Sequence, residues 1–415
     1  MKGKITLSQP LHRSFHNNYN KKELNSYGPI KKSNLIIIAV IGLLIALMIR
    51  YLFLDFISDD YKYFLKHWVE FFRENGGFAA LGQSIGDYNV PYLYFLALFS
   101  YIPVNDLYLI KVLSILFDIV LAFAAMKIIT SITKRNDLGL ITFFAVLLLP
   151  TVVVNSAMWG QCDSIYSAFG LLALYFAIKD RPVLSVAMAA IAFSFKLQIV
   201  FLLPIYAVFL FTGKIKIRHL FVFPLVYFIL FIPAALMGRP IADAILIYTS
   251  QVESYSKFLT LNAPSVYAFF DKLTYTTFYS TLGIAAAFAF LLVLLAYLLV
   301  RRDSLTLKTI IVAATLISLS VPFLLPSMHE RYFYISDVLS IVSAFVCPWL
   351  IPVPILVQLG SWTGYHAYLF GGGIGIKMGA VFMLLAIILL TASLIYMIEK
   401  NRNKPNSSGF YRSRL

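Results

Sequence analysis

Long apolar runs recur along the chain from Ser33 to Ile398, separated by short polar breaks. Runs such as 35–53, 284–300 and 378–398 are long enough to cross a bilayer as helices. Helices satisfy their own backbone hydrogen bonds within lipid. Strands of a membrane barrel would alternate apolar and polar residues instead. The pattern therefore predicts an all-α, polytopic integral membrane protein.

Basic residues gather at the two ends of the chain and in the breaks between apolar runs. The chain has 34 Lys and Arg residues against 19 Asp and Glu, an excess that by itself would suggest nucleic-acid binding. Lys and Arg also collect in the cytoplasmic loops of membrane proteins. The clusters lie at 1–34, 134–135, 179–181, 214–218, 301–308 and 399–415. This distribution indicates orientation and contact with membrane lipids, and no nucleic-acid partner is expected.

Placing every basic cluster on the cytosolic side gives about twelve crossings. The predicted spans are about 35–54, 106–131, 138–156, 164–179, 183–197, 199–212, 219–238, 281–300, 307–326, 332–350, 352–370 and 377–398. The longer external segments are about 55–105 and 239–280. One transmembrane domain over 35–398 would then lie between cytosolic basic tails at 1–34 and 399–415, with the first span kept as a signal anchor.

One apolar segment, 90–103, has two interpretations. It is short for a span. If it crossed the membrane, Lys134 and Arg135 would fall outside unless another crossing were lost. The basic clusters therefore favour a juxtamembrane helix or a re-entrant segment, and a crossing remains the alternative.

Polar residues at the predicted outer ends of spans form the candidate chemistry, because charged groups beside hydrocarbon are costly. The first constellation follows the first span, on an amphipathic interfacial helix, and contains Asp59, Asp60, His67 and Trp68. Its ordinary alternative is a solvated helix start capped by one of the two aspartates.

The second constellation lies between two apolar helices and contains Trp159, Gln161 and Asp163. A simple turn is the alternative: Gly160 would relax the backbone, and Asp163 or Ser164 would cap the next helix.

The third constellation is Lys196 with Gln198, after a long apolar stretch. Lys196 either extends its ammonium to the membrane surface or binds a lipid phosphate.

The fourth constellation is His329-Glu330-Arg331, between two apolar spans. Three consecutive charged or titratable residues favour a phosphate or anion site, although a polar cap beside an aromatic belt is the alternative. The histidines show no HExxH pattern, and Cys162 and Cys347 form no metal-binding pair.

In order along residues 35–335, these motifs resemble those of the GT-C superfamily of polyprenyl-phosphate-sugar-dependent glycosyltransferases. The nearest resemblance is to bacterial proteins similar to the PIG-V (GPI mannosyltransferase II) group. The segments that carry it are Asp59-Asp60-Tyr61, His67-Trp68, Asn89-Val90-Pro91-Tyr92, Trp159-Gly160-Gln161-Cys162-Asp163, Lys196-Leu197-Gln198, Asn262-Ala263-Pro264 and His329-Glu330-Arg331. The sequence departs from the family pattern in its doubled aspartate and in Val90, where the family has a proline.

The resemblance implies a GT-C-like fold and an inverting transfer of one sugar from a polyprenyl-phosphate donor to a glycan, lipid or protein acceptor. Asp60 would be the general base, with Asp59 as the alternate, and Lys196, His329 and Arg331 would bind the donor phosphate. Residues implied to contact substrate are His67, Trp68, Trp159, Gln161, Asp163, Gln198, Asn262 and Glu330. The site would face outward from a bacterial plasma membrane.

Two questions stay open at this stage. No metal is required by a monophosphate donor, and Mg²⁺ or Mn²⁺ is an open alternative. A glycan polymerase or ligase, or a flippase or transporter for lipid-linked glycans, is the rival class. A flippase would be expected to carry charged residues through the depth of many spans.

Cysteine labelling tests the predicted topology. In a background without Cys162 and Cys347, single cysteines would replace Ser84, Lys134 and Ser254. We expect an impermeant thiol reagent to label positions 84 and 254 from outside and to spare position 134, whose basic cluster marks the cytosolic side. External labelling at position 134 would overturn the topology.

Overall fold

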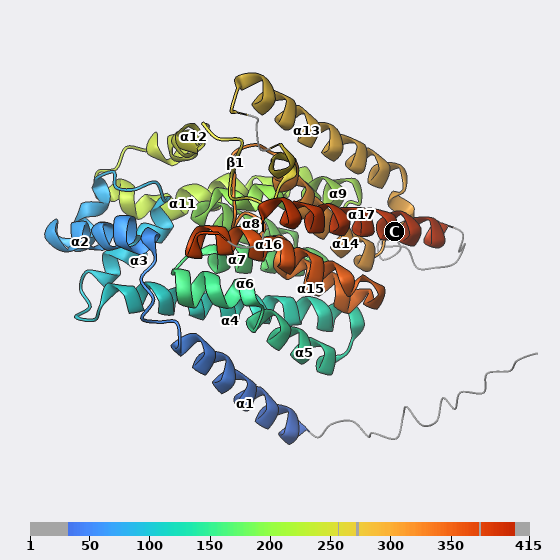
Figure 1. The fold of residues 1–415 in the computed structure, drawn as a ribbon, viewed down its shortest axis with the longest axis horizontal. Coiled ribbons are helices and arrows are strands. Elements are labelled where there is room, and N and C mark those ends of the chain that lie inside the picture. The colour runs from blue at the N-terminus through green and yellow to red at the C-terminus, as the bar shows by residue number, and fades with distance from the viewer. Residues whose placement is uncertain (1–31, 256, 271–273, 373–374, 403–415) are drawn as a thin grey trace, which may run out of the picture. The chain divides into compact units, whose positions relative to one another are not determined.

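Helices account for nearly all of the regular structure in the computed structural model, which describes residues 32–255, 257–270, 274–372 and 375–402 (Figure 1). The α-helices are α1 (Lys32–Tyr51), α2 (Lys66–Glu74), α3 (Val90–Phe99), α4 (Asp106–Thr133), α5 (Asn136–Leu147), α6 (Pro150–Val153), α7 (Asp163–Ile178), α8 (Pro182–Phe195), α9 (Ile205–Phe211), α10 (Ile217–Leu220), α11 (Val222–Leu236), α12 (Asp243–Tyr255), α13 (Thr277–Val300), α14 (Leu307–Leu324), α15 (Tyr334–Val346), α16 (Pro352–Phe370) and α17 (Ile376–Arg402).

Shorter elements connect these helices. Two are π-helical turns, η2 (Tyr61–Leu65) and η4 (Val154–Trp159). The 3₁₀ helices are η3 (Gly77–Gly82), η5 (Leu197–Phe201), η6 (Val266–Phe269), η7 (Arg302–Ser304) and η8 (Pro348–Leu350). Two strands, β1 (Thr260–Leu261) and β2 (Met328–His329), pair in parallel. The fold is therefore nearly all-α, and the prediction of a purely helical protein missed this one strand pair.

The chain divides into two units, residues 1–44 and 45–415. The described part of the first unit is helical and exposes large apolar side chains such as Ile36 and Leu44. The predicted tails lie mostly outside the described residues. The structure describes α1 from Lys32 and α17 up to Arg402, and the boundaries of the tails stay a prediction.

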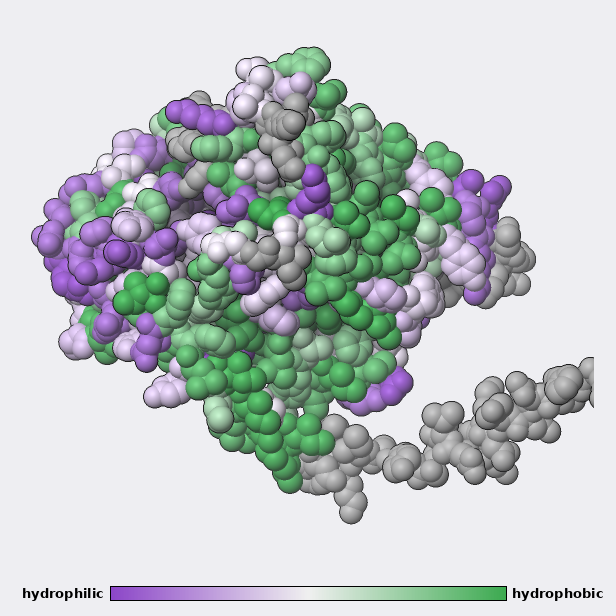
Figure 2. All heavy atoms as spheres, in the orientation of Figure 1, coloured by the Kyte–Doolittle hydropathy of each residue, from purple (hydrophilic) through white to green (hydrophobic). Residues whose placement is uncertain are grey.

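Five helices are long and apolar enough to cross a membrane, namely 106–133, 217–236, 277–300, 307–324 and 376–402. A bent pair, 136–147 with 150–159, would make a sixth. Figure 2 shows an apolar surface across the middle of one face, with hydrophilic residues gathered over α2 and α3 and near the C-terminal end of α17. These features support a membrane-embedded protein. The count of about twelve crossings stays a prediction.

Two predicted spans are broken by prolines. The predicted span at 138–156 consists of α5 and a second helical segment that begins at Pro150, and the two segments are bent by 53° relative to each other. The span at 199–212 becomes η5 and α9, with Pro204 between them. Proline lacks a backbone N–H and disfavours a helical conformation in the preceding residue. A single straight helix is therefore the wrong prediction at both places.

Two neighbouring groups of helices position the polar residues discussed below (Figure 1). In the first group, α7 packs against α4 and α8, and α4 also packs against α5. In the second, α17 packs against α14 and α16, and α15 packs against α14 and α16. Contacts of α15 with α4, α5 and α7 join the groups.

A buried ion pair lies in the helical core. Arg50 Nε and Nη2 donate to Asp118 Oδ2 at 3.0 and 2.8 Å, and Ser156 Oγ donates to the same oxygen at 2.5 Å. Arg50 Nη2 also donates to the carbonyl of Leu147 at 2.8 Å. Arg50 is 1% exposed and Asp118 is 0% exposed. Asp118, an acidic residue within the predicted span 106–131, thus has a cationic partner.

Arg50→Leu should destabilise the protein by about 3–5 kcal/mol, because it leaves the Asp118 carboxylate buried without its cation. Arg50→Leu combined with Asp118→Leu should recover most of that loss, since both charges are then absent. Thermal unfolding in detergent measures both variants, with the exposed Arg302→Leu as control. A single variant that melts like the wild type would show that the pair contributes nothing to stability.

Candidate functional site

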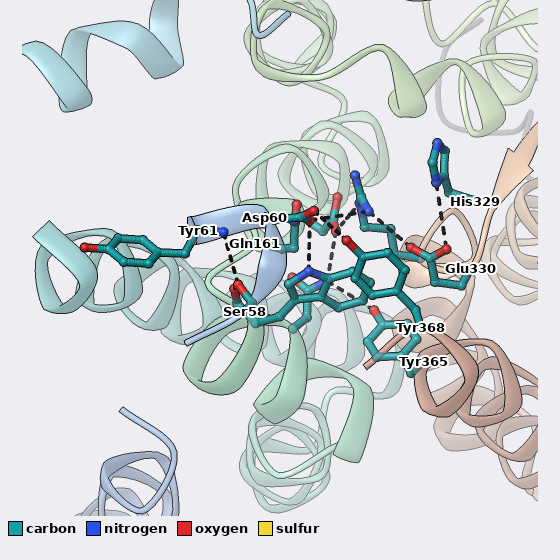
Figure 3. Close-up of polar contacts among 12 residues, drawn as sticks. Ser58, Asp60, Tyr61, Gln161, His329, Glu330, Tyr365 and Tyr368 are labelled. Carbon is teal, nitrogen blue, oxygen red and sulfur yellow. Dashed lines mark hydrogen bonds and ion pairs between the residues drawn. The ribbon is translucent and has the colours of Figure 1, made fainter. Parts of the chain in front are cut away.

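The Asp60 carboxylate lies in a buried polar cluster (Figure 3). Its Oδ2 atom accepts hydrogen bonds from Trp159 Nε1, at 2.9 Å, and from Gln161 Nε2. Its Oδ1 atom accepts one from the hydroxyl of Tyr368, at 2.7 Å. The Asp60 side chain makes no capping hydrogen bond to η2, which follows it. The alternative role of helix cap is therefore wrong for this residue.

The backbone before η2 sets the direction of the Asp60 side chain. Ser58 Oγ donates to the carbonyl of Trp159 at 2.7 Å and accepts from the Tyr61 N–H at 3.3 Å. Tyr61 points away from the cluster in Figure 3, and its hydroxyl lies 3.5 Å from Asn105 Oδ1. Neighbouring side chains on a helix diverge by roughly 100°, so Asp60 faces Trp159 while Tyr61 packs on the other side.

The turn at Gly160 brings two donors to Asp60. The π-helical turn η4 ends at Gly160, whose φ of +79° favours glycine. The Gln161 N–H then donates to the carbonyl of Asn155 at 2.9 Å. Trp159, on the other side of the turn, is fully buried and stacks on Tyr368 with ring centroids 4.7 Å apart. Side chains before and after the turn therefore reach the same carboxylate.

A second carboxylate, Asp163, is buried in the first turn of α7. Its Oδ1 atom forms an ion pair with Lys196 Nζ, and its Oδ2 atom accepts from Asn155 Nδ2 at 2.8 Å. Lys196 is 7% exposed, so its charge is balanced inside the protein and not by extension to the membrane surface. Sequence inspection found no acid near Lys196, because Asp163 lies 33 residues away along the chain.

Strand pairing holds the His329-Glu330-Arg331 segment in place. Strand β2 pairs with β1, and the Glu330 N–H donates to the carbonyl of Leu261 at 3.1 Å. Asn262, with φ of +57°, adds an antiparallel bridge to His329. His329 Nδ1 lies 3.8 Å from Glu330 Oε2. The strand pair thus fixes a short segment that has no helix of its own.

Arg331 lies among three carboxylates. Its Nη1 atom is 3.1 Å from Glu330 Oε1 and 3.8 Å from Asp60 Oδ2. Its Nε atom is 3.9 Å from Asp163 Oδ2. The guanidinium also stands 5.3 Å from the centroid of the Trp159 ring. Burial acts to lower the pKa of Arg331, but Asp60 and Glu330 outweigh it and raise that pKa well above its usual value. The group is therefore charged.

Two cavities adjoin the cluster. A small polar cavity of about 60 Å³ is lined by residues that include Asp60, Trp68, Asp87, Tyr88, Gln161 and Arg331. A larger apolar cavity of about 300 Å³ is lined by residues that include Gln198, Phe201, Gln251, Ile284, Leu325 and Tyr332. Arg331, which lines the polar cavity, and Tyr332, which lines the apolar cavity, are consecutive in the chain.

Some of the predicted site residues lie apart from the cluster. Asp59 is exposed and makes no hydrogen bond or ion pair with any residue that the structure describes. His67 is 63% exposed, with Nδ1 3.2 Å from Glu70 Oε2. Asn262 contributes its backbone bridge. Gln198 lines the apolar cavity, and its buried Oε1 atom accepts no hydrogen bond within the described part of the chain.

Sequence analysis missed five residues of the site. Tyr365 and Asn155 are joined by a 3.1 Å hydrogen bond, and Tyr88 donates to Gln161 at 3.3 Å. Tyr368 binds Asp60, and Asp87 lines the polar cavity. One weak signal existed, because Tyr365 and Tyr368 are three apart and share a helix face. That spacing is equally typical of an interfacial aromatic belt.

The sequence leaves Mg²⁺ or Mn²⁺ as an alternative. Over the ranges described, no three His, Cys, Asp or Glu side chains are grouped as metal ligands. Magnesium commonly binds through substrate phosphates and only one or two protein carboxylates.

Lys196→Met should destabilise the protein by about 3–5 kcal/mol, because it leaves the buried Asp163 carboxylate without its partner. Adding Asp163→Asn should restore most of the stability, since no unpaired charge then remains. Thermal unfolding in detergent measures both. Lys214→Met is the matched control, because its partner Asp180 is 55% exposed and such pairs contribute about 0–1 kcal/mol. Equal melting of the Lys196 single and double variants would contradict the expectation.

No protein-family model matches this chain, and no curated protein is significantly similar to it.

Proposed function

We propose that this protein is a membrane glycosyltransferase that moves one sugar from a polyprenyl-phosphate donor to a hydroxyl of a glycan, lipid or protein acceptor. The observation that carries the proposal is the convergence of distant polar motifs on one cluster, with Arg331 lining a polar cavity and the next residue, Tyr332, lining an apolar one. These are the motifs that resemble those of GT-C glycosyltransferases. The reaction would be a single displacement with inversion at the anomeric carbon, at the outer membrane face.

Arg331 is the best-placed ligand for the donor phosphate. Among the described residues, only one of its side-chain N–H groups makes a hydrogen bond, and its buried Nε makes none. A planar guanidinium can bind two phosphate oxygens at once. Lys196 is engaged by Asp163 and would add positive charge at longer range. His329, 13% exposed, would contribute from the edge of the cluster. Such cations stabilise the negative charge that grows on the departing phosphate.

Asp60 is the carboxylate best placed to act as base. It lines the polar cavity, and its Oδ1 atom accepts a bond from Tyr368 alone among the described residues. A carboxylate oxygen has two acceptor directions, so Oδ1 keeps one for the acceptor hydroxyl. Asp163 is a weaker candidate, since Lys196 and Asn155 engage both of its oxygens. Asp59 is exposed and outside the cavity lining.

The apolar cavity suits the lipid part of the donor. Its lining includes Phe201, Ile284 and Leu325, and also Tyr332, which follows the proposed phosphate ligand Arg331 in the chain. An amphiphile with its phosphate at Arg331 would bury apolar chain in this cavity if the chain ran past Tyr332, and that burial contributes about 25 cal/mol per Å². A water-soluble nucleotide sugar has no such apolar portion. An apolar cavity lined by the neighbour of Arg331 therefore favours a lipid-linked donor.

Reconstitution separates this proposal from its rivals. The purified protein would be placed in liposomes with a polyprenyl-phosphate hexose labelled in the sugar. A transferase releases unlabelled polyprenyl phosphate and passes the label to an acceptor. A flippase moves the intact lipid across the bilayer without releasing phosphate, and a polymerase or ligase requires an oligosaccharide donor. Movement of intact donor without release would contradict the proposal.

Asp60→Asn should lower the turnover number about 10²–10⁴-fold, because the amide keeps the shape of the carboxylate but cannot accept the proton. Donor binding should persist, since Arg331 and Lys196 remain. Asp59→Asn is the matched control, because the neighbouring carboxylate is exposed and outside the cavity lining. Release of polyprenyl phosphate measures both variants. An active Asp60→Asn protein beside an inactive Asp59→Asn protein would reverse the assignment of the base.

A further inference from the structure

Lys111 is a buried cation that none of the motifs above includes. It lies on α4 and is 0% exposed. Its ammonium donates to three backbone carbonyls, those of Phe53 at 2.9 Å, Leu54 at 2.8 Å and Phe56 at 2.6 Å. Within the described part of the chain, no carboxylate oxygen lies within ion-pair distance of it. Carbonyl dipoles are therefore its direct partners, and the Asp55 carboxylate acts on it at longer range.

The three carbonyls belong to the irregular segment that leads from α1 to Asp60. This segment makes few hydrogen bonds of its own, the turns at 50–53, 51–54 and 53–56. A second contact from the same helix supports it, because the Tyr108 hydroxyl donates to Asp55 Oδ1 at 2.7 Å. Side chains of α4 thus fix both the backbone and one side chain of the segment.

Lys111 also lies near the second segment of the site. A Cβ atom added at Gly160 would lie 3.7 Å from Lys111 Cγ, so the aliphatic stem passes beside that turn. The turn carries Trp159 and Gln161, the two donors to Asp60 Oδ2. One side chain therefore binds the backbone that leads to the carboxylate and lies beside the backbone that delivers its hydrogen-bond donors.

A buried ammonium without a carboxylate at ion-pair distance is costly in a membrane protein, because dipoles and a more distant charge offset its desolvation only in part. An apolar side chain would fill the same space without that cost. It could not, however, satisfy three carbonyls in a segment that has no regular structure, and unsatisfied buried carbonyls are themselves costly. The Lys111 ammonium therefore stabilises one conformation of this segment, the one in which its carbonyls accept these hydrogen bonds.

We infer that Lys111 is a positioning residue for the Asp60 base. It holds the 53–56 backbone against the Gly160 turn, so that the carboxylate meets Trp159, Gln161 and the acceptor hydroxyl in one geometry. The inference rests on the proposed function, and it adds a residue that touches neither substrate nor the reacting atoms. A displacement of about 1 Å in such a site can slow the reaction about 10²-fold.

Lys111→Met tests this in the reconstituted transferase. The expected result is a turnover number about 10–100-fold lower, with the KM for polyprenyl-phosphate hexose within about twofold of wild type. In an Asp60→Asn background, Lys111→Met should lower the turnover number by less than about a further twofold. Lys111 is inferred to act through the Asp60 carboxylate, which that background already lacks. Lys127→Met is the control, since Lys127 lies on the same helix with its ammonium over the Phe123 ring. Additive losses in the double variant would overturn the inference.

Hydrogen–deuterium exchange gives a readout that needs no activity. Peptides covering 52–61 should exchange faster in Lys111→Met than in the wild type and in Lys127→Met, while peptides of α14 and α17 should be unchanged. If the methionine variant does not fold, Lys111→Gln replaces it in the experiment. Glutamine keeps two N–H donors, so peptides 52–61 should exchange at a rate between those of the wild type and a variant without donors. Unchanged exchange at 52–61 would overturn the inference. If peptides 52–61 exchange faster in Lys111→Met but the wild-type protein transfers no sugar, the anchoring by Lys111 is upheld and the proposed function fails.

Discussion

The mutual neutralisation of buried charges is the constraint on which the site depends. Asp60, Asp163 and Glu330 stand around Arg331, and Lys196 holds Asp163 from the other side. Each group alone would be costly to bury. Each is balanced by at least one charge of opposite sign, and the balancing charges come mostly from other segments of the chain. The segments must therefore fold together, since removing any one leaves an uncompensated charge on another. The cluster is thus as much a folding constraint as a chemical device.

The charge balance of this cluster bears on what it can bind. Three carboxyl groups, those of Asp60, Asp163 and Glu330, stand with Lys196 and Arg331 in this cluster. His329 Nδ1 lies 3.8 Å from Glu330 Oε2. A general base must be anionic before it takes the proton from the acceptor, and it becomes neutral as it does so. Arg331 can serve an anion best, because most of its donors are uncommitted.

The amino-acid pattern predicted the long helices well and the irregular segments poorly. Spans predicted at 106–131 and 307–326 are helices at 106–133 and 307–324, because uninterrupted apolar runs leave no other way to satisfy the backbone. The break before Pro150 could have been predicted from the proline itself. The π-helical turns η2 and η4 have no sequence signature that we could apply, and the two-residue strands are too short to show a period. Their positions depend on tertiary contacts.

The same contrast explains which site residues were found. Charged residues are rare beside apolar spans, so Lys196 and Arg331 stood out. Tyr365 and Tyr368 did not stand out, because the chain has 26 tyrosines and a single one carries no signal. Asn155 is uncharged and did not stand out either. Asp59 and Asp60 were indistinguishable as residues, and only the turn into η2 separates an exposed carboxylate from a partly buried one. Regular helices direct neighbouring side chains apart. Convergence of Trp159 and Gln161 on one oxygen therefore requires the irregular turn at Gly160, and the irregular backbone is where the chemistry of this protein is determined.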